Sequence, residues 1–124
     1  MYERQYITFL YSFNELRDYY ECHDLLEDLW LEEGREPFYQ GLLQVAVSCY
    51  HLENGNIAGA RKLMDLAIKK LFLYPSIWMG IDVNKLIHDG KSYLPMYLEK
   101  RAEPITIYIC DQTLFQLVEQ IKLP

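Results

Sequence analysis

The predicted fold centres on a helix whose middle is Cys22-His23-Asp24-Leu25-Leu26-Glu27-Asp28-Leu29-Trp30. His23 and Glu27 are four residues apart, so a helix places them on one face, one turn apart. Large apolar side chains recur on the same face at helical spacing. They are Leu16, Tyr19, Tyr20, Leu26 and Trp30. We therefore expect this face, and the His23–Glu27 pair with it, to point into the protein.

Outward from this stretch, the apolar pattern predicts a succession of helices joined by short turns. The central helix is expected at about 15–33, with Asn14 as its cap and Gly34 at its end. Other helices are expected at about 2–13, 37–52, 57–74 and 82–98, with a loop at 76–81. Gly90 and Pro95 should interrupt or kink the last of these. Hairpins at 15–53 and 57–100 then give an all-α fold, a small antiparallel bundle of about five helices.

The C-terminal residues change to an alternating pattern that is typical of a strand. Ile105, Ile107 and Ile109 alternate with more polar residues, and a short helix at about 114–121 follows. A single strand has no neighbour to pair with in a helical bundle. We therefore expect this segment either to lie extended over the helices or to pair with its copy in another chain. The second alternative predicts a homodimer, or a protein partner, through residues 105–124. These residues are an extension of the domain at 1–104 and do not form a domain of their own.

Composition narrows the class of protein. The chain has 124 residues, enough for one domain, and a formal net charge of −6. An acidic surface disfavours nucleic acid and anionic membranes as partners. Three cysteines without a CxxC spacing fit reduced thiols, and neither a signal peptide nor an apolar run of membrane-spanning length is apparent. These features predict a soluble cytoplasmic protein.

The predicted helix at 37–52 carries no charged residue. Its polar side chains form one narrow stripe on an otherwise apolar cylinder: Gln40, Gln44, Ser48 and His51. A stripe that faces water normally carries lysine or glutamate. We therefore expect the neutral stripe to line an interior polar network, although a solvent-facing stripe is the simpler alternative.

Several motifs resemble a known family. Its opening motif, written loosely as His-x-x-x-Glu-x-x-Trp, is similar to Phe13-Asn14, Tyr20-Glu21-Cys22-His23, Leu26-Glu27 and Trp30. Its centre is similar to Phe38-Tyr39-Gln40-Gly41-Leu42, Gln44, Ala46, His51, Gly55-Asn56 and Gly59-Ala60-Arg61, and its closing signature to Gly80-Ile81-Asp82-Val83. The sequence thus resembles domain-of-unknown-function family 309, over about residues 9–86.

The resemblance implies a compact helical bundle in which the His-Glu motif is suspected of binding a metal, and it brings no established activity. Asp24 departs from the family pattern, which commonly has glutamate directly after the histidine. The acid is retained with a shorter reach, which leaves a direct role for this position in doubt.

The residues themselves suggest a metal site made of His23, Glu27 and His51. Facing side chains of adjacent helices can meet, because such helices pack about 8–10 Å apart. Two imidazoles and a carboxylate suit zinc or iron with an open position. Glu27 is then also the candidate catalytic base of a metal-dependent hydrolase, and Gln40 or Gln44 would orient the ligands.

Two other points bear on this metal site. Arg61 can bind an anion near its helix start or simply face solvent. The spacing His-x-x-x-Glu is common in helices, and stronger catalytic spacings such as His-Glu-x-x-His are absent. The competing hypothesis is therefore a structural or protein-interaction module, in which Glu27 holds His23 by a buried hydrogen bond and no metal is bound.

Overall fold

The computed structural model describes residues 2–122 and shows an all-α protein with a very small β-hairpin. Its helices are α1 (Arg4–Tyr11), α2 (Tyr19–Glu32), α3 (Pro37–Glu53), α4 (Ile57–Leu71), α5 (Val83–Leu98) and α6 (Gln112–Lys122). A π-helical turn, η1 (Ser12–Leu16), follows α1, and the hairpin consists of β1 (Ile77–Trp78) and β2 (Ile81–Asp82). The predicted fold class is confirmed.

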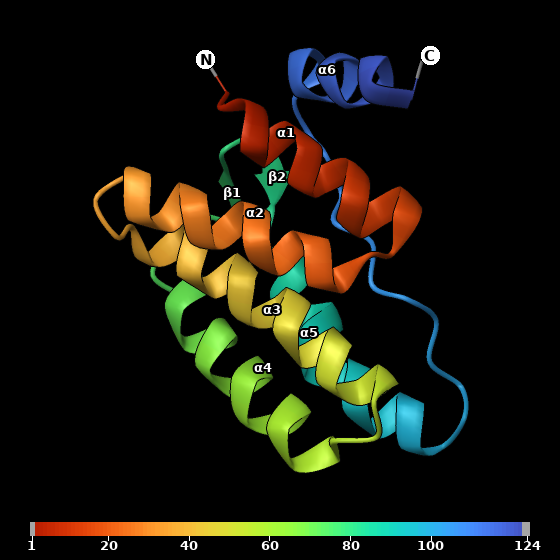
Figure 1. Ribbon diagram of the computed structural model, residues 1–124. Coiled ribbons are helices and arrows are strands. Elements are labelled where there is room, and N and C mark those ends of the chain that lie inside the picture. The colour runs from red at the N-terminus through yellow and green to blue at the C-terminus, as the bar shows by residue number, and fades with distance from the viewer. Residues whose placement is uncertain (1, 123–124) are drawn as a thin grey trace.

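The helices α2, α3 and α4 lie side by side, with α5 behind them and α1 and α6 at one end (Figure 1). Side chains from α1 to α5 meet in one core, and four aromatic or aliphatic residues of the α1 region are completely buried: Tyr6, Phe9, Leu10 and Phe13. No helix within residues 2–122 has the length and apolar character needed to cross a membrane.

Local signals at the helix ends are as predicted. The Asn56 side chain accepts a hydrogen bond from the Gly59 amide and caps α4, and Asp82 caps α5 through the Lys85 amide. Gly34 follows α2 with φ +72°, a conformation that glycine adopts without steric cost. Pro95 lies inside α5 and does not end it.

The predicted boundary between the first two helices is wrong. The η1 turn lies between them, and Arg17 with φ +55° ends it. Helix α2 therefore begins at Tyr19, and its cap is Asp18, which accepts a hydrogen bond from the Glu21 amide. Asn14, which was predicted to be this cap, instead hydrogen-bonds to the C-terminal segment.

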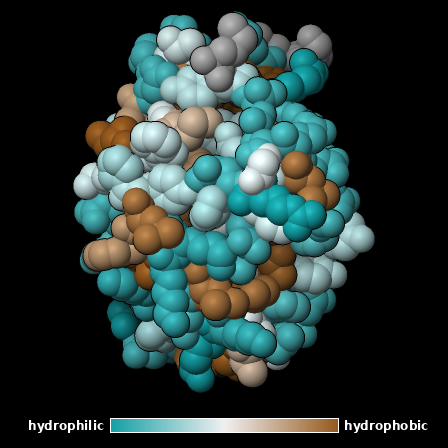
Figure 2. Space-filling model, turned by 90° about the vertical axis from the view of Figure 1, so that its left-hand side faces the viewer, coloured by the Kyte–Doolittle hydropathy of each residue, from teal (hydrophilic) through white to brown (hydrophobic). Residues whose placement is uncertain are grey.

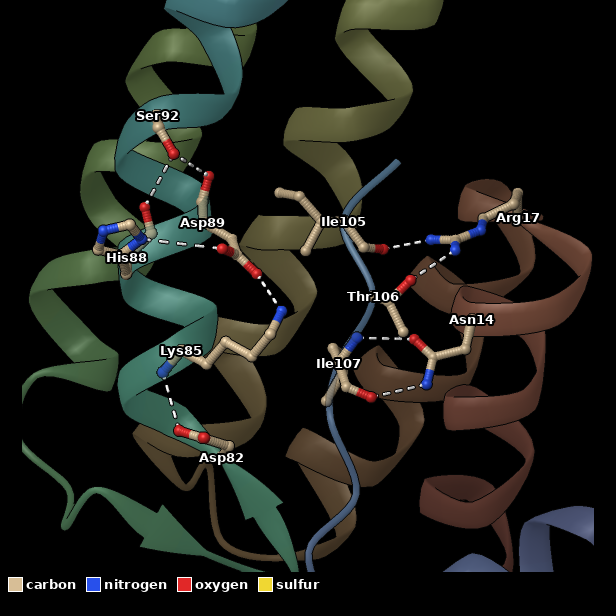
Figure 3. A network of polar contacts seen from close by, with 10 residues as sticks. All are labelled: Asn14, Arg17, Asp82, Lys85, His88, Asp89, Ser92, Ile105, Thr106 and Ile107. Atoms are coloured by element: carbon tan, nitrogen blue, oxygen red, sulfur yellow. Dashed lines mark hydrogen bonds and ion pairs between the residues drawn. The ribbon is translucent and has the colours of Figure 1, made fainter. Parts of the chain in front are cut away.

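Asn14 and Arg17 hold the C-terminal segment on the bundle. The Asn14 side-chain amide donates to the Ile107 carbonyl at 2.9 Å and accepts from the Ile107 amide at 2.8 Å. Arg17 donates to the Ile105 carbonyl and to Thr106. Figure 3 shows both side chains reaching the same face of this extended segment. Asn14 thus pairs with the segment as a neighbouring strand would.

The tail, residues 101–122, lies extended over the helices before it enters α6, which confirms the first of the two predicted arrangements. Ile105 and Ile107 are buried in the common core, as are Leu114 and Val118 of α6.

The predicted loop at 76–81 is in fact the hairpin. It gives the tail a partner, because Ile109 forms a bridge with Ile81 and the Asp82 amide donates to the Tyr108 carbonyl.

Candidate functional site

His23 and Glu27 contact each other on α2, as their spacing predicts, with 3.1 Å between Nε2 and Oε2. The expectation that this face is buried holds for Tyr19 and Leu26. It is wrong for the pair itself, because 40% of the His23 side chain and 48% of the Glu27 side chain are exposed. Tyr20 and Leu16 from the same predicted face are more exposed still, at 61% and 54%. The pair therefore lies at the edge of the helix interface, not inside it.

The cause is the register of α2 against its neighbours. Its buried residues are Tyr19, Cys22, Leu26 and Leu29, and their common centre lies about 80° around the helix from His23 at 100° per residue. Helices α1 and α3 pack against α2 and cover the side with Cys22 and Leu29. Leu16 belongs to η1 and does not continue the α2 face.

The two ring nitrogens of His23 both face carboxylates. Nδ1 is 3.2 Å from Oδ1 of Asp24, and Nε2 contacts Glu27. Both contacts are hydrogen bonds only when the ring carries a proton on each nitrogen. A ring nitrogen that donates its proton to a carboxylate has no lone pair free for a metal.

His51 faces the same side of the molecule from α3. Its Nδ1 lies 3.4 Å from the Asn56 side-chain nitrogen. The amide orientation of Asn56 is set by its cap, because its oxygen accepts the Gly59 amide at 2.9 Å. The Asn56 nitrogen is therefore a donor, His51 Nδ1 accepts, and the ring proton lies on Nε2.

A narrow groove between α2 and α3 brings the two histidines together. It has a volume of about 180 Å³ and is lined by Tyr19, Tyr20, His23, Val47, Tyr50 and His51. The Tyr20 ring lies 5.9 Å from that of Tyr50 across the groove and 6.3 Å from that of His23. We call these six residues the aromatic groove.

The polar stripe of α3 is not part of this groove except for His51. Gln44 accepts a hydrogen bond from Lys70 at 3.0 Å, and Ser48 donates to the Ala60 carbonyl at 2.6 Å. Both partners belong to α4, so the stripe faces α4 and not His23. Gln40 is half-buried on the same helix, and Arg61 is exposed on α4. The expected interior network around His23 is therefore not formed.

The metal hypothesis needs ligand side chains that lie close together. Within residues 2–122, no three His, Cys, Asp or Glu side chains lie close enough to hold a metal ion together. A histidine that binds metal through Nε2 needs an acceptor at Nδ1, whereas Asn56 offers His51 a donor. As arranged, His23, Glu27 and His51 do not fit a metal site.

The buried thiols do not supply a nucleophile. Cys22 and Cys49 are free and buried. Burial raises the pKa of the Cys49 thiol to about 12 and that of Cys22 well above its usual value. Both thiols therefore stay protonated at neutral pH, and reactivity requires the thiolate.

A larger cavity of about 440 Å³ lies between α5 and the tail. Three of its charged side chains are already in ion pairs: Lys85 contacts Asp89 at 2.6 Å, as Figure 3 shows, and Arg101 contacts Glu99 at 2.9 Å. Ser92 bonds to carbonyls of its own helix. These contacts leave few of the lining groups available to a ligand.

Sequence reasoning missed the part that tyrosines play in the groove. Tyr20 was expected on an inward face and Tyr50 was given no role, yet both are exposed. The available signal was their proximity to His23 and His51 in sequence, three residues and one residue away respectively.

Fold and site together define a small helical-bundle protein with an aromatic, histidine-containing groove between two helices. The family model described as "Domain of unknown function (DUF309)" matches residues 6–63, which include both histidines of the groove. This match confirms the resemblance seen in the motifs over the N-terminal half of the chain.

One curated relative is the "Uncharacterized protein YpuF" of Bacillus subtilis (strain 168). It is 42% identical over 74 residues, which make up 57% of this chain and 42% of the relative. The matched part therefore spans less than half of that relative's length.

Proposed function

We propose that the chain is a cytoplasmic protein-interaction module that takes one anchoring side chain of a partner protein in the aromatic groove. The observation that carries this proposal is the groove's size and lining. Sites for whole small molecules usually enclose about 300–1,000 Å³, whereas this groove has about 180 Å³. That volume suits a single apolar or aromatic side chain, and such anchors dominate protein interfaces.

The charge of α2 supports a basic partner. Between Tyr19 and Glu32 this helix has five acidic residues and no lysine or arginine: Glu21, Asp24, Glu27, Asp28 and Glu32. A segment with lysine or arginine on either side of its anchor would meet complementary charge, which speeds association and orients the partner. The same acidity disfavours nucleic acids and anionic membranes, and the free cysteines fit a reducing compartment.

The experiment is selection from a phage-displayed library of random peptides, with Tyr50→Ala protein for counter-selection. We expect enriched peptides to share an apolar or aromatic residue flanked by lysine or arginine, and to bind with a Kd in the micromolar range. Tyr50→Ala should weaken binding at least about tenfold, which corresponds to about 1.4 kcal/mol.

The control is Tyr108→Ala, because Tyr108 is an exposed tyrosine on the tail, at 58% against 37% for Tyr50. Its affinity for the same peptides should not change. Enrichment of acidic peptides, equal binding by both variants, or no enrichment at all would contradict the proposal.

A second candidate function is a metal-dependent hydrolase that uses His23, Glu27 and His51. One observation favours it, namely that both histidines line the same groove. This function requires His23 to break its contact with Asp24 or Glu27, and the side-chain amide of Asn56 to rotate away from His51. Elemental analysis of protein purified without a histidine tag tests it: stoichiometric zinc or iron that is lost in His51→Ala supports the hydrolase, and its absence removes this candidate.

A further inference from the structure

The two most exposed large apolar side chains within residues 2–122 lie on the corner that joins α4 to the hairpin: Phe72 and Leu73, at 73% and 72%. Ile77 and Trp78 of β1 lie on the same corner and are 59% and 42% exposed. We call these four residues the apolar corner. The connection from α4 to β1 lies on the left in Figure 1, and Figure 2 shows hydrophobic groups exposed on that side of the molecule.

The backbone of this corner is held rigidly. Met79 and Gly80 both have positive φ, +51° and +77°, which makes the type I′ turn that matches the twist of a hairpin. The Tyr6 hydroxyl donates to the Met79 carbonyl at 2.8 Å, and the Gly80 carbonyl accepts the Cys110 amide at 2.7 Å. A fixed apolar surface loses little conformational entropy when a partner covers it.

The hairpin has one covered edge and one open edge. On the β2 side, the Asp82 amide donates to the Tyr108 carbonyl at 2.9 Å. Ile77 is the cross-strand partner of Asp82. In an antiparallel ladder, two directly opposite residues either hydrogen-bond to each other or both direct their amide and carbonyl groups away from each other. Because Asp82 points outward to the tail, the Ile77 amide and carbonyl point outward from the opposite edge.

From this geometry we infer that the chain forms a two-fold symmetric dimer in which the apolar corner and the β1 edge of one copy cover those of a second copy. A two-fold axis beside Ile77 makes the two copies of this residue a hydrogen-bonded pair, each amide donating to the other carbonyl. The two hairpins then form one continuous sheet. Each described hairpin has a single open edge, so this pairing consumes both edges and closes the assembly.

Charge and area favour a second copy over another partner. The four side chains carry no charge, so the apolar corners of two copies can pack against each other without electrostatic repulsion. With about 150–250 Å² for each large side chain, the exposed fractions give about 400–600 Å² per copy, or about 1,000 Å² in the pair. This reaches the area of about 1,000 Å² that a specific interface needs.

Sedimentation velocity from about 1 to 100 µM tests the dimer with three variants. Leu73→Asp places charges against each other at the interface. Ile77→Pro keeps the apolar area but removes the outward amide, which the monomer does not use. Leu16→Asp is the matched control, because Leu16 is an exposed leucine of η1 away from the corner.

We expect wild-type protein and Leu16→Asp to sediment as dimers at the upper concentrations, and Leu73→Asp and Ile77→Pro to remain monomers with unchanged helical circular dichroism. The proposal is overturned by a wild-type protein that stays monomeric or forms open-ended assemblies. It is equally overturned by a dimer that survives either corner variant, or by loss of the dimer in the control.

A measurement on the wild-type protein covers the case in which a variant fails to fold. Hydrogen exchange at the Ile77 amide should slow at least about tenfold between the monomeric and dimeric concentrations, because this amide becomes paired. Exchange at the Cys110 amide, which is bonded within one chain, should not change. An Ile77 amide whose exchange is independent of concentration contradicts the dimer.

Discussion

Asn14 offers the sharpest test of how the tail is attached. Asn14→Ala removes two hydrogen bonds, at 2.9 Å and 2.8 Å, between this side chain and the Ile107 backbone. Ile107 is only 1% exposed, so water does not easily replace the lost partner. Each bond contributes about 1 kcal/mol, and unpaired buried groups cost about 1–3 kcal/mol more. We expect a loss of about 2–4 kcal/mol in the free energy of unfolding.

Urea denaturation followed by circular dichroism measures this loss. The matched control is Asn54→Ala, because the Asn54 amide donates to the Tyr50 carbonyl at 2.8 Å but lies in an exposed place. This control should cost less than about 1 kcal/mol. The melting temperature of Asn14→Ala should fall by roughly 10 °C, given about 3–5 °C per kcal/mol for a chain of this size.

Hydrogen exchange shows whether the loss acts through the tail. The Asp82 and Cys110 amides are bonded across the contact between the hairpin and the tail, so both should exchange faster in Asn14→Ala by the same factor. The reasoning is refuted if Asn14→Ala costs less than about 1 kcal/mol, or if the exposed control costs as much.

Three further results are expected. Glu27→Gln should change the free energy of unfolding by less than about 1 kcal/mol, because its ion pair is half exposed, and thermal unfolding measures this. Gly80→Ala should lower the free energy of unfolding by at least about 2 kcal/mol, and Gly55→Ala by about 1 kcal/mol. Both glycines have positive φ, but an added Cβ at Gly80 would lie 2.7 Å from Leu114, whereas Gly55 borders open space. Urea titration measures both losses. Stability should fall as the pH rises from 10 to 12, because burial raises the pKa of several tyrosines from 10 to about 12. The unfolded state therefore releases these protons at lower pH than the folded state does. The absorbance of tyrosinate and the circular dichroism should change together. These tyrosines are Tyr2, Tyr39, Tyr74 and Tyr93.

The candidate site was only partly predictable. The spacing of His23 and Glu27 determined their ion pair, because four residues make one helical turn. Their exposure was not predictable, because α2 has apolar residues on more than one side and its neighbours decide which side is covered. His51 lines the aromatic groove, but Gln44 and Ser48 of the same polar stripe contact α4 instead.

What the sequence by itself determined is the set of helices and most of their ends. Asn56, Asp82 and Gly34 act on amides or dihedral angles within a few residues of themselves, and such local interactions can be read without the fold. The resemblance to the family rests on the same kind of local motif, and the family model matches residues 6–63.

Only the tertiary structure decided where the tail lies and what covers the hairpin. Each strand has two residues, too short for a periodic signal, and its pairing with Ile109 joins segments far apart in the chain. Asn14 looks like a helix cap in the sequence, yet it pairs with Ile107, 93 positions away. Contacts of this range depend on how whole helices pack, and no local pattern records them.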